Sequence, residues 1–121
     1  MTVFDASALL AFLLGEPGAD LVESRLSTGG CVGAANWSEV ARKVGSVPDA
    51  WPSARDLLLS YPLTVEPVTR LDAEGAAALW RPGEGLSLAD RLCLALAERL
   101  HSEALTADRA WEGRDAVVLI R

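Results

Sequence analysis

Short apolar runs alternate along this chain with longer segments in which apolar residues recur every three or four positions. Runs of the first kind predict β-strands, and segments of the second kind predict amphipathic helices. We expect strands at residues 3–4, 31–34, 63–67, 104–106 and 117–120. We expect helices at residues 7–14, 19–26, 36–44, 51–60, 71–80 and 87–100, with a helical turn at 108–111.

The order of these elements predicts the fold class. Short, continuously apolar strands that alternate with helices are typical of a parallel sheet covered by helices on both faces. The sequence therefore predicts a three-layer α/β/α fold with about five strands, and residues 1–121 fit a single domain. Pro67 favours an edge position for the strand that it ends, since proline has no N–H to donate. The helix at 87–100 is apolar on nearly every side, which predicts a buried element.

Composition and charge narrow the classes of function. Half of the 121 residues are hydrophobic, which argues against disorder, and no apolar stretch approaches the roughly 20 residues of a membrane span. The first residues do not resemble a secretion signal, so we expect a cytoplasmic protein in which Cys31 and Cys93 are free and buried. The net charge of −6 argues against a module that holds DNA by bulk electrostatics. It permits an enzyme that recruits cations into an acidic pocket.

Four acidic residues are expected at the carboxyl edge of the sheet, which is where open parallel α/β sheets bind ligands. Asp5 and Asp108 closely follow strands, whereas Glu39 and Asp90 are expected in the first turn of their helices. Four carboxylates at one edge repel one another unless a positive charge compensates. A hard divalent cation with oxygen ligands is the simplest solution, so the sequence predicts a metal site.

Each acid taken singly has a simpler explanation as a helix cap. The segment from Ser87 to Asp90 fits a capping box, and the segment from Asn36 to Glu39 fits the same pattern with asparagine as the cap. Acids in a first helical turn are also favoured by the helix dipole, by about 0.3–1 kcal/mol. The two explanations are compatible, because helix N-termini can soften the repulsion between carboxylates when no metal is bound.

The segments that carry these acids are residues 5–8 (Asp-Ala-Ser-Ala), 36–40 (Asn-Trp-Ser-Glu-Val), 85–95 and 105–111. Their order and spacing resemble the PIN-domain ribonucleases, and within that family the VapC-type toxins of bacterial toxin–antitoxin pairs. The resemblance extends over the whole chain. It implies a five-stranded parallel sheet, a homodimer, and metal-dependent endonucleolytic cleavage of structured RNA such as tRNA or rRNA.

The resemblance also assigns roles to the acids. By position, Asp5, Asp90 and Asp108 would hold Mg²⁺ or Mn²⁺. Glu39 would complete the site, either as a ligand to a second ion or by orienting the attacking water. A metal ion would supply hydroxide near neutral pH and offset charge on the scissile phosphate.

Neighbouring polar residues have weaker assignments. Ser7 and Thr106 match small polar positions of the family's site, where they would hydrogen-bond the carboxylates, although Ser7 is equally explained as a helix cap. Arg91 and Arg109 each follow a site acid and are candidates for contact with RNA phosphate, or for solvated or ion-paired positions. The single histidine, His101, excludes a ribonuclease mechanism based on two histidines.

The resemblance implies a protein partner as well. Toxins of this type are held inactive by a cognate VapB-type antitoxin, whose tail lies across the active-site groove. We expect a partly apolar groove from residues that would otherwise fill the core, namely Leu9, Leu10, Phe12, Leu13 and Trp51.

Other functions fit the sequence less well. A haloacid-type phosphatase needs a second aspartate two positions after the first, where this chain has Ser7. A receiver domain needs a lysine at a late strand end, but the only lysine is Lys43. A catalytically silent PIN-fold module that sequesters RNA or a partner protein remains the alternative to an enzyme.

Overall fold

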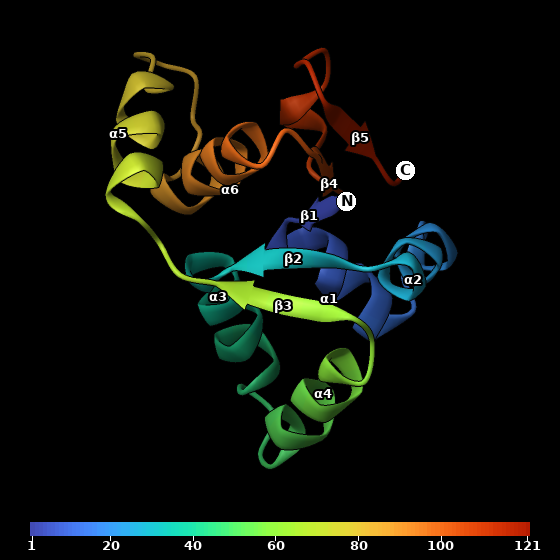
Figure 1. Cartoon of the computed structure of the whole chain (residues 1–121). Helices are drawn as coiled ribbons and strands as arrows, with labels where there is room; N and C mark the ends of the chain where they lie inside the picture. Colours follow the sequence, from blue (N-terminus) through green and yellow to red (C-terminus); the bar gives the residue numbers. More distant parts are fainter.

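Five parallel strands form one sheet at the centre of the computed structural model, which describes every residue from Met1 to Arg121 (Figure 1). The strand order is β3-β2-β1-β4-β5, and every neighbouring pair is parallel. This confirms the predicted parallel sheet and the edge position of the strand that Pro67 follows. The strands are β1 (Thr2–Phe4), β2 (Gly30–Gly33), β3 (Leu63–Glu66), β4 (Glu103–Thr106) and β5 (Val117–Leu119).

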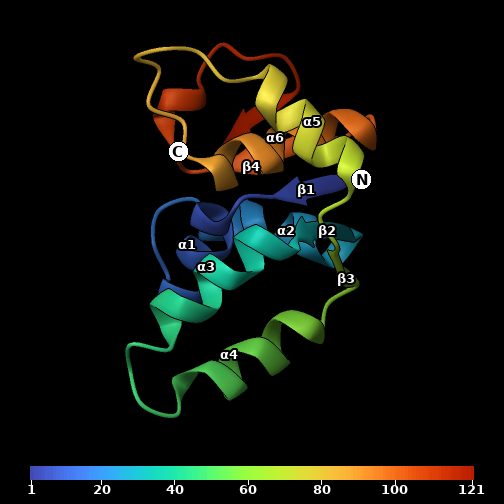
Figure 2. The same ribbon diagram turned by 90° about the vertical axis from the view of Figure 1, so that its left-hand side faces the viewer.

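Helices cover both faces of this sheet, as the predicted three-layer fold requires. Figure 2 shows α5 and α6 on one side of the strands, with α1, α2, α3 and α4 on the other. None of these helices combines the length and the apolar character that crossing a membrane requires. The helices are α1 (Ala6–Leu14), α2 (Ala19–Thr28), α3 (Ala34–Val44), α4 (Ala50–Leu59), α5 (Arg70–Ala78) and α6 (Leu88–Arg99), with a short 3₁₀ helix η1 (Arg109–Trp111).

The middle strand β1 supplies buried side chains to both layers of the core. Successive residues of a strand point to opposite faces of the sheet. Accordingly, Val3 belongs to a buried cluster with Cys93 of α6, whereas Phe4 belongs to the larger cluster that contains Leu9 of α1. Both cysteines are free and buried, as expected. Because β1 pairs with β2 and β4, the residue after Phe4 lies at the middle of the sheet's carboxyl edge.

The structure corrects the predicted start of α3. This helix begins at Ala34, and Gly33 is its N-cap with extended backbone angles and no side-chain cap. Asn36 is therefore the third helical residue rather than the cap, and Glu39 lies in the second turn rather than the first. Alanines at positions 34 and 35 favour helix and leave the glycine as the boundary.

The expectation that α6 is buried on nearly every side is met only in part. Cys93, Leu96 and Ala97 are buried on one face and Ala95 is buried on the side of Gly75 in α5, whereas Leu88 is 59% exposed. Apolar composition alone does not bury a helix, because burial depends on what packs against each face. Here α6 contacts the sheet, α3 and α5, and only Leu88 and Glu98 are exposed.

An ion pair joins α5 to α6. Arg99 Nε donates to Asp72 Oδ1 at 2.6 Å and Arg99 Nη2 donates to Asp72 Oδ2 at 3.2 Å, while Asp72 also completes a capping box with Thr69. Burial works to raise the pKa of Asp72, but the hydrogen bonds from Arg99 and Thr69 outweigh it and lower that pKa. The ionised carboxylate therefore stabilises the folded chain.

We predict that Asp72→Asn lowers the free energy of unfolding by about 1.5–3 kcal/mol at pH 7, as expected for a hydrogen-bonded charged group. Because the folded-state pKa is lowered, this contribution is present above the ordinary aspartate pKa and is lost as the pH falls through the folded value. Urea unfolding at pH 7 and pH 3 tests this. Glu74→Gln, which removes an exposed ion pair of the same helix, should change stability by less than ~1 kcal/mol. An equal loss of unfolding free energy for Asp72→Asn at both pH values would contradict an electrostatic origin of the stabilisation by Asp72.

Candidate active site

Asp5 lies directly after β1 and only 4% of it is exposed. Two hydroxyl groups donate to the same carboxylate oxygen, Oδ2: Ser7 Oγ at 2.5 Å and Thr106 Oγ1 at 2.8 Å. The other oxygen, Oδ1, lies 3.4 Å from the amide nitrogen of Asn36. The expected hydrogen bonds of Ser7 and Thr106 to a carboxylate are thus present, and Ser7 is the second helical residue rather than the cap of α1.

Backbone groups fix the direction of these hydrogen bonds. The N–H of Ala107 donates to Ser7 Oγ at 2.9 Å, and the N–H of Asp108 donates to Thr106 Oγ1 at 3.0 Å. Each hydroxyl has one proton to give. Ser7 Oγ and Thr106 Oγ1 lie 3.1 Å apart, but an ionised carboxylate can only accept, so both hydroxyls donate to Asp5 while each accepts from the backbone.

The charge of Asp5 has no cationic partner within the chain, because none of the ion pairs includes it. Burial raises the pKa of Asp5, the hydrogen bonds from Ser7 and Thr106 act in the opposite direction, and the charge of Asp90 adds to the rise. The metal-free protein therefore holds a buried carboxylate whose ionised form is disfavoured.

Asp90 and Asp108 both accept hydrogen bonds from backbone N–H groups at a helix start. Asp90 Oδ2 accepts from the N–H of Ser87 at 3.0 Å, and Ser87 Oγ accepts from the N–H of Asp90 at 3.1 Å, which completes the predicted capping box. Asp108 Oδ1 accepts from the N–H of Ala110 at 2.9 Å at the start of η1. In each carboxylate the cap uses one oxygen and leaves the other without a protein partner.

Glu39 is half-buried in the second turn of α3. Its place relative to the other acids is indicated by Cys93, a buried thiol of α6. Burial raises the pKa of this thiol well above its ordinary value, and the charges of Asp5, Asp90 and Glu39 raise it further. Three of the predicted site acids thus lie near enough to Cys93 to raise the pKa of its thiol.

The four acids suit a hard divalent cation in donor chemistry and charge. They offer only carboxylate oxygens, which Mg²⁺ and Mn²⁺ prefer, and the uncompensated charge of Asp5 favours a cation. However, no three His, Cys, Asp or Glu side chains lie close enough to form a ready ligand group. Binding of one ion by three of these acids would therefore require their side chains to move closer together.

The two arginines differ in what they contact. Arg91 Nη1 donates to the carbonyl oxygen of Ala76 at 2.9 Å in α5, and its Nε is buried without a partner. This placement between two helices does not favour the RNA contact predicted for Arg91. Arg109 is exposed and contacts the carbonyl oxygen of Arg121 and the carboxylate of Glu112. An RNA contact by Arg109 stays a prediction.

A partly apolar groove of about 810 Å³ begins at Ser7, next to Asp5, and runs between α1 and the region of α3 and α4. Of the residues expected to line it, Leu10 and Leu13 do so, together with Leu14, Val44, Val47 and Leu57. The others do not line this groove: Leu9 is fully buried, Phe12 packs edge-on against Tyr61, and Trp51 packs against Trp37.

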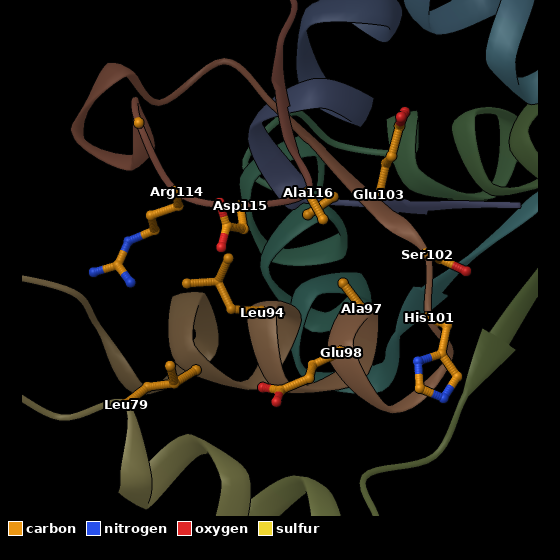
Figure 3. A pocket seen from close by; sticks show the side chains of 12 residues that line it. Leu79, Leu94, Ala97, Glu98, His101, Ser102, Glu103, Arg114, Asp115 and Ala116 are labelled. Carbon is orange, nitrogen blue, oxygen red and sulfur yellow. The ribbon is translucent and has the colours of Figure 1, made fainter.

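A second hollow, of about 730 Å³, lies at the opposite end of the strands. Figure 3 shows residues of α6 along one side of it, with His101 and Glu103 near the start of β4. His101 therefore lies away from the carboxyl edge that carries the acids.

Asn36 is the site residue that the sequence did not reveal. Only 1% of it is exposed, and its amide nitrogen lies 3.4 Å both from Asp5 Oδ1 and from the carbonyl oxygen of Ala89. The pattern from Asn36 to Glu39 suggested a cap. The signal that could have indicated the site was a polar residue on the apolar, inward face of a helix.

Comparisons with known proteins agree with the observed fold. The family model for the PIN domain matches residues 2–116, whereas a search of curated protein sequences finds no match. A chain of a toxin–antitoxin complex from Klebsiella pneumoniae superposes with a TM-score of 0.80 at 21% sequence identity, covering 100% of this chain and 98% of that chain. A chain of VapBC2 from Rickettsia felis, bound to a DNA fragment from its promoter, gives a TM-score of 0.73 at 13% identity, covering 98% and 96%. At these identities the two structures show a shared fold.

We predict that Asp5→Asn stabilises the metal-free protein at neutral pH, by roughly 3 °C or more in Tm. The raised folded-state pKa means that ionisation of Asp5 destabilises the fold. This penalty is absent well below the ordinary aspartate pKa and grows as the pH rises from that value through the folded value. Thermal unfolding in EDTA at pH 4 and pH 7.5 checks both the sign and the trend.

Asp115→Asn makes the same chemical change at an exposed loop position and should leave Tm nearly unchanged. A metal-free Asp5→Asn protein that is less stable than wild type at pH 7.5 would contradict the argument that the carboxylate is buried at a cost.

Proposed function

This chain belongs to the PIN-domain family, whose model matches residues 2–116, and from that premise we propose that it is a metal-dependent endoribonuclease acting as the toxin of a VapBC-type toxin–antitoxin pair. PIN domains are nucleases, and the chain would form a single such domain over residues 1–121. Support for the toxin assignment comes from the two structural neighbours, which are described as a toxin–antitoxin complex and as VapBC2.

The observation that carries the proposal is the buried, uncompensated carboxylate of Asp5 at the middle of the sheet's carboxyl edge. We propose that Asp5, Asp90 and Asp108 hold Mg²⁺ or Mn²⁺ and that Glu39 completes the site. When bound, the ion would activate water as a nucleophile near neutral pH and offset negative charge on the scissile phosphate of a structured RNA.

The chain's own residues prepare this site. Ser7 and Thr106 hold the Asp5 carboxylate in one orientation through protons that the backbone directs. The capping bonds of Asp90 and Asp108 hold these carboxylates at the same edge and leave one oxygen of each available. Arg109, exposed next to Asp108, is a candidate contact for RNA phosphate.

A cognate antitoxin would bind the groove that begins at Ser7. Several apolar side chains there are exposed, including Leu14, Val47 and Leu57, and they could receive the apolar face of an amphipathic segment. Such a segment would extend towards the acids and block them. We also expect the toxin to be a homodimer, as the family resemblance implies.

The second candidate function is a catalytically silent PIN-fold module that sequesters RNA or a partner protein. All four acids of the family's site are present in this chain, and this observation favours the enzyme. The two functions differ in whether RNA bound by the protein is cut.

We predict that the antitoxin-free protein cleaves structured RNA with Mg²⁺ or Mn²⁺ and that EDTA stops the reaction. Asp90→Asn should lower the cleavage rate at least about 100-fold, since even groups that only support metal ligands commonly contribute 10- to 100-fold. The asparagine oxygen can still accept from the N–H of Ser87, so Tm should remain close to wild type. Gel analysis of labelled tRNA and rRNA measures the rate.

Asp115→Asn, an exposed acid near the second hollow, is the matched control and should cleave at the wild-type rate. Cleavage that survives both EDTA and Asp90→Asn would overturn the metal mechanism. Tight RNA binding without any cleavage by the wild-type protein would favour the binding module.

We predict that Val47→Glu weakens antitoxin binding about tenfold or more while leaving RNA cleavage intact, because it places a charge in the apolar groove away from the acids. The measurement is co-purification with the antitoxin from a shared operon, together with growth of a host that expresses both. Leu71→Glu, an exposed leucine of α5 outside the groove, is the control and should retain the antitoxin. Equal retention of the antitoxin by both variants would exclude the groove as its binding surface.

A further inference from the structure

Asn36 connects two of the proposed site's elements while belonging to a third. Its amide nitrogen lies 3.4 Å from Asp5 Oδ1, just after β1, and 3.4 Å from the carbonyl oxygen of Ala89, in the first turn of α6. The next residue after Ala89 is Asp90. One side chain of α3 therefore contacts one proposed metal ligand and the backbone adjacent to another.

The orientation of the Asn36 amide follows from these neighbours. Both atoms facing its nitrogen are acceptors, and the amide nitrogen carries two protons, one for each. The opposite orientation would place the amide oxygen against two other oxygens. Asn36 thus acts as a double donor that links Asp5 to the start of α6.

This arrangement is unfavourable for stability. Both contacts are long for hydrogen bonds, and the amide oxygen Oδ1 is buried with no partner at all. The surroundings of that oxygen are small or apolar: a Cβ on Gly33 would lie 3.3 Å from it and 3.5 Å from a methyl group of Leu96. A leucine is branched at Cγ like asparagine and would bury no unpaired polar atom.

We propose that Asn36 is a positioning residue that fixes Asp5 relative to the start of α6, and with it Asp90, so that both acids face the proposed divalent ion. The proposal rests on the proposed function, because it assigns Asn36 a role towards the same metal site. Asn36 contacts a proposed ligand, Asp5, and it supplies two donors without supplying a charge.

The first test compares stability with metal affinity in Asn36→Leu. We expect Tm in EDTA to be equal to or above the wild-type value, and the Mn²⁺ dissociation constant, measured by titration calorimetry or electron paramagnetic resonance, to rise about tenfold or more. A tenfold change corresponds to about 1.4 kcal/mol. Thr2→Val is the matched control, since Thr2 is also buried and polar but lies at the opposite end of β1. It should leave the Mn²⁺ affinity unchanged.

A second test needs no variant. Asn36 is the only asparagine of the chain, which contains no glutamine, so it produces the only side-chain carboxamide signal in a ¹⁵N–¹H spectrum. In the wild-type protein this NH₂ pair should shift on titration with Mg²⁺ and saturate with the same dissociation constant as the backbone signals of Asp5 and Asp90. It should not respond to K⁺ at matched ionic strength.

The outcomes separate the two proposals. The positioning role is wrong if the signals of Asp5 and Asp90 shift with Mg²⁺ while the carboxamide pair does not. It is also wrong if Asn36→Leu binds Mn²⁺ as the wild-type protein does. In both cases the metal site stands. A marked loss of Tm in Asn36→Leu would overturn the claim that asparagine at this position makes the folded protein less stable than leucine would. If no signal responds to Mg²⁺ and no Mn²⁺ binds, the metal mechanism fails and the role of Asn36 fails with it.

Discussion

The burial of the Asp5 carboxylate is the constraint on which the rest of the site depends. It follows from topology, because β1 is the central strand and pairs in parallel with a strand on each side. Whatever residue follows β1 is enclosed by the ends of its neighbours and by the helices that start there. An acid at that position loses most of its hydration, and no lysine or arginine compensates it. The hydroxyls of Ser7 and Thr106 orient the carboxylate but bring no positive charge.

Asp90 and Asp108 add negative charge near Asp5, and their hydrogen bonds to the backbone reduce the cost of this repulsion to the folded protein. Asp90 and Asp108 each direct one oxygen to backbone N–H groups at a helix start, where the helix dipole favours a negative charge. In this way the role of helix cap and the role of candidate ligand are compatible in one side chain. The helix starts compensate part of the repulsion in the metal-free protein, and a cation would compensate the remainder.

Much of this could be predicted from the sequence, and the parts that could not have physical reasons. Alternating apolar runs and helical periodicities predict the parallel sheet, and the positions of Asp5 and Asp108 after strands place them at its carboxyl edge. The start of α3 was misplaced because Gly33, Ala34 and Ala35 are compatible with the end of a strand or the start of a helix. The direction of Arg91 was not predictable either, since it depends on the packing of α5 against α6. Local sequence determines which helices and strands form, whereas the packing of these elements determines which groups a long side chain contacts.

Asn36 illustrates why a neutral hydrogen-bond donor suits the position beside Asp5 at the carboxyl edge of the sheet. An arginine or lysine there would pair with Asp5 and stabilise the folded chain, but its charge would occupy the place of a divalent ion. A leucine would pack well and leave the Asp5 carboxylate with one fewer donor and no link to the start of α6. An amide donates to Asp5 Oδ1 without cancelling its charge, and its remaining proton reaches Ala89. The amide oxygen Oδ1 of Asn36 is left unpaired as a consequence, because no hydrogen-bond donor lies near it.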